Sequence, residues 1–163
     1  MLSPTLFSNI KPHLPPLLRE ATPCLIYSTE LNGISLSTMF DLSNNRGPCI
    51  LCIKDSNCNL FGAFLNHDLY RRKGYYGNGT CFLFKLSPTF SIFKATGLNQ
   101  YFILSEHGAD LAIGGGSTGF GLWLDDSLFS GYSCRCETFD NEVLCGGDGK
   151  FECDVLELWA FVI

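Results

Sequence analysis

The sequence predicts a mainly β protein with a few short helices, folded as an antiparallel sandwich or barrel. Short runs of aromatic and β-branched residues recur along most of the chain and are separated by Gly, Asn, Pro and Ser. This spacing is typical of antiparallel strands joined by turns. Only two segments have helical patterning, and no strand is followed by the long helix that a parallel α/β fold needs. The two helices are therefore expected to cap the sheets.

Both helices are expected in the first third of the chain. The first covers residues 15–19, where two consecutive prolines suit the first helical turn. The second follows Ser35, whose hydroxyl can cap a helix. Leu36, Met39 and Phe40 then recur on one helical face, which is the pattern of an amphipathic helix.

The remaining chain is expected to form strands. Two apolar runs within residues 48–66 flank the turn-forming stretch Asp55-Ser56-Asn57, which predicts a hairpin. Six further runs have the same strand-like character: TCFLFKLS, SIFKATG, QYFILSE, DLAIGG, GFGLWLD and DVLELWAFVI.

Length and hydropathy predict one cytoplasmic domain. A chain of 163 residues can bury its own hydrophobic core, and it contains no repeat or low-complexity linker. No apolar run approaches the ~18 residues of a membrane span. The N-terminus lacks the basic start and continuous apolar core of a secretory signal. We therefore expect no direct membrane insertion. The nine cysteines are an odd number, which argues for reduced thiols and against a disulfide framework.

Charge is unevenly distributed along the chain. Residues 1–105 carry nine Lys/Arg and five Asp/Glu, whereas residues 106–163 carry two Lys/Arg and eleven Asp/Glu. The longest basic run is Arg71-Arg72-Lys73, which is too short for the basic stripe of a nucleic-acid binder. We expect no nucleic-acid partner. The acidic C-terminal part indicates either a partner with a basic surface or a solubilising surface.

Residues 114–119 match the GxGxxG spacing of a dinucleotide loop. Such a loop needs a helix directly after its glycines, because the helix N-terminus holds the pyrophosphate. The segment that follows Gly119 is instead strand-like and ends at Asp125 and Asp126. The glycines are therefore expected to permit a bend or a close backbone approach between two strands. No nucleotide cofactor is expected.

The cysteines and histidines give no recognisable metal or catalytic site. Cys49 and Cys52 are expected on opposite faces of one strand, so they cannot act as a zinc knuckle, and no metal is predicted. No histidine is paired in sequence with a cysteine, although pairing in space stays open. Thiol chemistry is the remaining alternative. Cys134 and Cys136 flank Arg135 and are the candidate redox residues, since a nearby cation favours a reactive thiolate.

Taken together, the segments resemble the TLDc domain of oxidation-resistance proteins. The resemblance is carried in order by LPPLLR, LIYSTELNGISLSTMF, GPCILCIKD, FGAF, YYGNGTCFLF, TGLNQYF, LAIGGGSTGFGLWLDDSL, CETFDN and LELWAF. It places a TLDc-like domain at residues 11–163, after a lead-in at residues 1–10. Three positions depart from the family pattern. Thr80 replaces a usual Glu, Ala95 an aromatic residue and Ala160 a Gly.

The resemblance implies a two-sheet antiparallel β-sandwich flanked by two short helices. It also implies protection against oxidative stress and binding to the peripheral sector of the vacuolar-type proton-translocating ATPase, whose assembly some members regulate. No catalytic residue is implied, so we expect a non-catalytic interaction module. A cysteine-based antioxidant or an enzyme of unknown reaction is the alternative. Such a partner would bring a cytoplasmic protein to vacuolar or lysosomal membranes, and a mitochondrial location stays open.

The glycine-rich stretch then has two possible roles. It can simply turn the chain into the next strand, or it can act as a recognition loop as well, since loops often carry binding residues. For the second role the expected contact residues are Gly115, Gly116, Ser117, Asp125 and Asp126.

Overall fold

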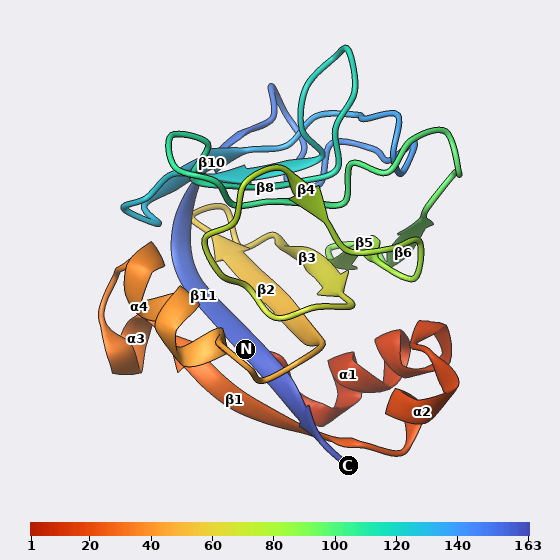
Figure 1. Cartoon of the computed structure of the whole chain (residues 1–163), viewed down its shortest axis with the longest axis vertical. Coiled ribbons are helices and arrows are strands. Elements are labelled where there is room, and N and C mark those ends of the chain that lie inside the picture. The colour runs from red at the N-terminus through yellow and green to blue at the C-terminus, as the bar shows by residue number, and fades with distance from the viewer.

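The computed structural model describes residues 1–163 and contains one continuous antiparallel sheet of eleven strands (Figure 1). Apart from β1, the strands follow the order β4-β7-β8-β9-β10-β11-β2-β3-β5-β6, and β1 pairs with β11. The strands are β1 (Thr22–Ser28), β2 (Cys49–Asp55), β3 (Leu60–Leu65), β4 (Tyr75–Tyr76), β5 (Phe82–Ser87), β6 (Ser91–Lys94), β7 (Ile103–Leu104), β8 (Leu111–Ile113), β9 (Leu122–Leu124), β10 (Ser130–Tyr132) and β11 (Lys150–Val162).

The sheet folds into two layers because β11 belongs to both. Its first residues, 150–152, pair with β10, and residues 153–160 pair with β2. The register shifts between Cys153 and Val155, so a bulge lies where the strand passes from one layer to the other. Bulges bend a strand in this way at the corners of sandwiches. The expected antiparallel, mainly β sandwich is confirmed, with the difference that one long strand joins its two sheets.

Alternation along the strands produces two separate hydrophobic clusters. The larger contains 27 buried residues and lies between the layers, where Leu51, Phe61 and Leu83 pack with Ile113 and Leu124. The smaller contains 10 buried residues on the opposite face of the β2–β3–β5 layer. Cys49 belongs to the first cluster and Cys52 to the second, as expected for positions an odd number apart in a strand.

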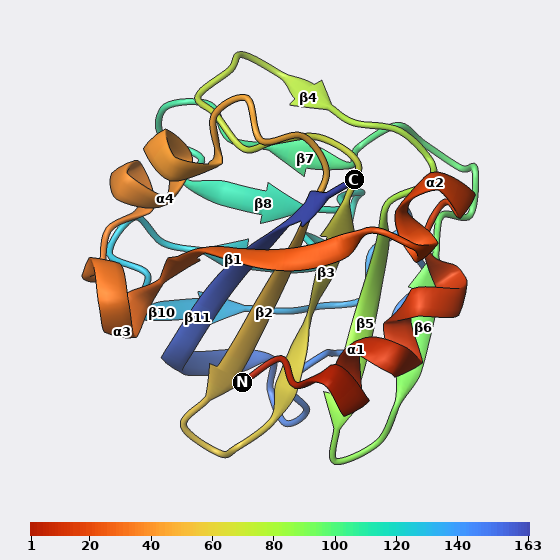
Figure 2. The same ribbon diagram turned by 90° about the horizontal axis from the view of Figure 1, so that it is seen from below.

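Four short helices cover the layers, two more than expected: α1 (Pro4–Ile10), α2 (Pro16–Arg19), α3 (Thr29–Asn32) and α4 (Leu36–Ser43), with a 3-10 turn at Lys11–His13. Figure 2 shows α1 and α2 over β5 and β6, where buried residues from both helices complete the smaller cluster. The expected helix after Ser35 is confirmed, since the Ser35 hydroxyl accepts the Thr38 N–H at 3.1 Å. None of the helices has the length and apolar character that crossing a membrane requires.

Candidate interaction surface

The glycine-rich stretch connects β8 to β9 and opens no helix. Gly114 has a φ of +76°, and a Cβ there would lie 2.8 Å from the sulfur of Cys136. Gly116 has a φ of +146°, and a Cβ there would lie 2.9 Å from the carboxyl carbon of Glu137. L-residues rarely adopt such φ values. The glycines therefore permit a tight strand connection, as expected, and no helix N-terminus is available to hold a phosphate.

Hydrogen bonds fix this connection to the segment at residues 134–140. The Gly115 N–H donates to the Thr138 hydroxyl at 2.9 Å, and both residues are buried. At the exposed tip, the N–H and hydroxyl of Ser117 both donate to Glu137 Oε1, at 3.1 and 2.7 Å. These two hydrogen bonds lower the pKa of Glu137. Of the predicted contact residues in this loop, Ser117 is exposed, Gly116 half-buried and Gly115 buried.

Asp125 and Asp126 lie at the other end of β9, in the turn that leads to β10. The Asp125 carboxylate accepts hydrogen bonds from the hydroxyls of Ser127 and Ser130, both at 2.7 Å. Partial burial acts to raise the pKa of Asp125, but these hydrogen bonds outweigh it and lower the pKa overall. Asp125 therefore shapes the turn. Asp126 is exposed, and its backbone carbonyl accepts the Leu36 N–H at 3.4 Å.

The five predicted contact residues lie in two loops, one at each end of β9. The three residues of β9 separate the glycine loop from the aspartates, because the loop precedes Leu122 and the turn follows Leu124. Asp110, just before β8, is an acidic neighbour of the turn. Partial burial, followed by the charges of Asp126 and Asp125, raises the pKa of Asp110 in spite of Arg71. Asp110, Asp125 and Asp126 thus form an acidic corner. Of the two aspartates predicted as contact residues, Asp126 is the exposed one.

The structure places the two candidate redox cysteines in different surroundings. Cys136 is fully buried and its thiol donates to Asn141 Oδ1 at 3.2 Å. Cys134 is half-buried beside the Gly119 backbone. Burial raises the pKa of both thiols. The Arg135 guanidinium pairs with Asp140, its Nε donating to Oδ1 at 2.6 Å. Burial therefore keeps both cysteines as thiols, whereas the thiolate is the reactive form.

We expect iodoacetamide at neutral pH to modify Cys58 in the folded protein well before Cys52. Cys58 is exposed in the β2–β3 turn, whereas Cys52 is buried and burial raises its pKa to about 12. Since only the thiolate reacts, the rates should differ by at least about tenfold. Mass-spectrometric peptide mapping of timed reactions measures this. Equal labelling of both cysteines in folded protein would contradict the burial seen here.

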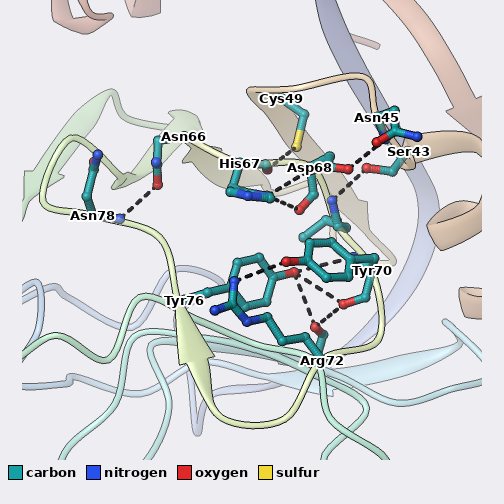
Figure 3. Close-up of polar contacts among 12 residues, drawn as sticks. Ser43, Asn45, Cys49, Asn66, His67, Asp68, Tyr70, Arg72, Tyr76 and Asn78 are labelled. Carbon is teal, nitrogen blue, oxygen red and sulfur yellow. Dashed lines mark hydrogen bonds and ion pairs between the residues drawn. The ribbon is translucent and has the colours of Figure 1, made fainter.

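A polar network surrounds Asp68 and contains a cysteine and a histidine, the residue types of a catalytic pair (Figure 3). The structure brings Cys49 close to His67, but the thiol contacts the His67 backbone carbonyl at 3.6 Å and not the imidazole. The imidazole Nδ1 lies 2.6 Å from Asp68 Oδ1. Asp68 Oδ2 accepts the Asn45 N–H at 2.7 Å, which ties this loop to the end of α4. The network therefore supports loop structure, and its cysteine is not placed beside a base.

The other titratable groups form no metal centre. No group of three or more His, Cys, Asp or Glu side chains is arranged to hold a metal ion. Arg71, the first residue of the basic run, donates from one guanidinium nitrogen to the carbonyls of Ser105, Glu106 and Asp110, at 3.2 to 3.3 Å. These hydrogen bonds hold the loop between β7 and β8.

Comparison with known proteins supports the family suggested by the sequence motifs. The family model described as the TLDc domain matches residues 1–162. Oxidation resistance protein 1 of Homo sapiens is 38% identical over 162 residues, which is 99% of this chain and 18% of that relative. Nuclear receptor coactivator 7 of Homo sapiens is 42% identical over 138 residues, which is 84% of this chain and 14% of that protein. The chain thus spans less than a fifth of the length of these relatives.

Proposed function

Because this chain belongs to the TLDc domain family, we propose that it is a non-catalytic interaction module that binds the peripheral sector of the vacuolar-type ATPase. Regulating the assembly of this pump would be its contribution to protection against oxidative stress. The observation that carries the proposal is the family match over nearly the whole chain. The name oxidation resistance protein 1, borne by relatives at 38% identity, supports the stress-related part.

The architecture suits an interaction module. Hydrogen bonds from Ser117 to Glu137, and from Ser127 and Ser130 to Asp125, order two of the exposed loops, which lowers the ordering entropy that opposes binding. The segment from residue 106 onward carries eleven acidic and two basic side chains. An acidic surface of this kind speeds encounter with a basic partner. Binding that is tighter to one assembly state of the pump than to another would shift the population toward that state.

Affinity capture of the tagged chain from cell lysate, followed by mass spectrometry, tests the proposal. We expect peripheral-sector pump subunits to be recovered with the wild-type chain. Asp126→Lys reverses an exposed charge at the acidic corner and should reduce recovery by about two- to fivefold, the effect of a rim charge pair of up to ~1 kcal/mol. Asp125 is left intact, because its carboxylate holds the turn.

Glu20→Lys is the matched control. It makes the same charge change at an exposed residue that directly follows α2. This residue is outside the acidic corner. Recovery with Glu20→Lys should equal that of the wild type. Capture of no pump subunit by a folded wild-type chain would overturn the proposal.

A further inference from the structure

The outer face of β9, β10 and the start of β11 contains a hollow with a volume of about 850 Å³. This groove, which we call the β10 groove, is open to solvent and lies on the layer away from α1 and α2. It is lined by aromatic, hydroxyl, acidic and basic side chains, among them Trp123, Ser130, Tyr132, Asp148, Lys150 and Glu152.

Strand alternation explains which side chains face the groove. The central residue of β10 is Gly131, and a Cβ there would point at the buried Phe151 ring, 2.7 Å from its Cζ. The flanking residues Ser130 and Tyr132 therefore face outward. Their partners across the ladder are Glu152 and Lys150, which are exposed. The groove thus places the charged side chains of β11 beside Tyr132 of β10.

Three aromatic rings with nearly parallel planes lie next to one another on this face. The rings of Trp123 and Tyr132 have centroids 5.5 Å apart and an interplanar angle of 27°. Phe120 continues the row, with its centroid 6.4 Å from that of Tyr132 at 29°. The Trp123 indole N–H donates to the Ala109 carbonyl at 3.0 Å, which fixes the ring plane. All three side chains are half-buried, so the row is rigid yet reachable from solvent.

The charges around these rings are mainly negative. Glu152 and Asp148 line the groove and are exposed, against Lys150 as its basic residue. Asp125 adds a third carboxylate beside it, since its Oδ2 accepts the Ser130 hydroxyl. Aromatic faces attract cations, most strongly those of Trp, and guanidinium groups stack on them. Ring faces and acidic rim thus favour the same kind of ligand.

We propose that the β10 groove binds a basic segment of a partner protein, with an Arg or Lys side chain stacked on the Trp123–Tyr132 row and paired with Glu152. The proposal deepens the proposed function by giving a partner chemistry and a contact surface. It does not require that the partner be the pump. An acidic segment would be repelled by the rim, and a purely apolar one would make no use of the negative charges of Glu152 and Asp148.

Titration of isotope-labelled protein with a short Arg-rich peptide, followed by NMR, tests this directly. We expect the Trp123 indole N–H signal to shift on titration, while that of Trp159, on the opposite face of the β2–β3–β5 layer, stays in place. A Glu-rich peptide of equal length should produce no shift. Tyr132→Ala should weaken binding about threefold, as expected for one exposed cation–π contact, and Tyr132→Phe should restore it. Glu152→Lys should weaken binding by about two- to fivefold.

Glu20→Lys controls for net charge, since it makes the same change outside the groove. Equal weakening by Glu20→Lys and Glu152→Lys would overturn the proposal, and so would binding that is unaffected by Tyr132→Ala. Equal binding of the Glu-rich peptide, or of an uncharged oligosaccharide in place of the Arg-rich peptide, would also overturn it. If the peptide binds at the groove but no pump subunit is captured, the pump is rejected as the partner. The site for a basic segment is then still supported.

Discussion

Gly114→Ala is expected to lower the free energy of unfolding by about 3 kcal/mol. A residue with a side chain costs roughly 1–2 kcal/mol in the left-handed region, and Gly114 has a φ of +76°. Its Cβ would also lie 2.8 Å from both the Cys136 sulfur and the Phe139 ring, which are buried in the core. Overpacking of this kind adds about 1–3 kcal/mol. Urea unfolding followed by circular dichroism measures the loss.

Gly79→Ala is the matched control for this change. Gly79 is exposed and outside the left-handed region, and a Cβ there would make only ordinary contacts at 3.9 Å with Ala95 and Phe102. Its effect should stay within about 0.5 kcal/mol, as for most surface substitutions. If the two variants were equally stable, the glycine-rich stretch would not have the structural role assigned to it here.

Glu157→Ala is also expected to cost about 3 kcal/mol. Glu157 is 7% exposed in the middle of β11. Its Oε1 accepts the Leu2 N–H at 3.0 Å and the Trp159 indole N–H at 3.1 Å, so it ties the N-terminal segment to the sheet. Truncation to Ala would leave two donors without this acceptor, and each buried unpaired donor costs roughly 1–3 kcal/mol. Denaturant unfolding measures the sum.

Hydrogen exchange distinguishes local release of the N-terminal segment from a general loss of packing. Amides of α1 (Pro4–Ile10) should lose protection in Glu157→Ala before those of β2 and β3 do. Glu157→Gln keeps an oxygen acceptor at the same position but removes the ion pair of Glu157 Oε2 with the Met1 ammonium, 3.6 Å away, so it should recover part of the lost stability. A Glu157→Gln variant as unstable as Glu157→Ala would show that the two hydrogen bonds do not carry the effect.

Local signals allowed much of the fold to be predicted from the sequence. Ser35 begins α4 because its hydroxyl accepts the Thr38 N–H, and the β2–β3 hairpin turns at the predicted polar residues. The helix α1 was missed, although Ser3 caps it in the same way and Pro4 occupies its first turn. Four-residue α3 has too few residues to show helical periodicity.

The parts that sequence could not give depend on contacts between distant segments. The passage of β11 from one layer to the other depends on a bulge near Asp154, which has no sequence signature. Asp125 and Asp126 lie at the opposite end of β9 from the glycine loop, and the hydroxyls of Ser127 and Ser130 that hold the Asp125 carboxylate carry no sequence signature of that role. The β10 groove was missed because Trp123, Tyr132 and Glu152 come from three different strands and meet only through ladder pairing.

Titration of the purified chain against the purified, soluble peripheral sector of the pump tests the central claim most directly. The account predicts saturable binding that weakens with added salt, since an acidic surface contributes to it. It also predicts that Glu20→Lys binds as the wild type does, whereas Asp126→Lys binds more weakly. No association by a chain that circular dichroism shows to be folded would contradict the claim.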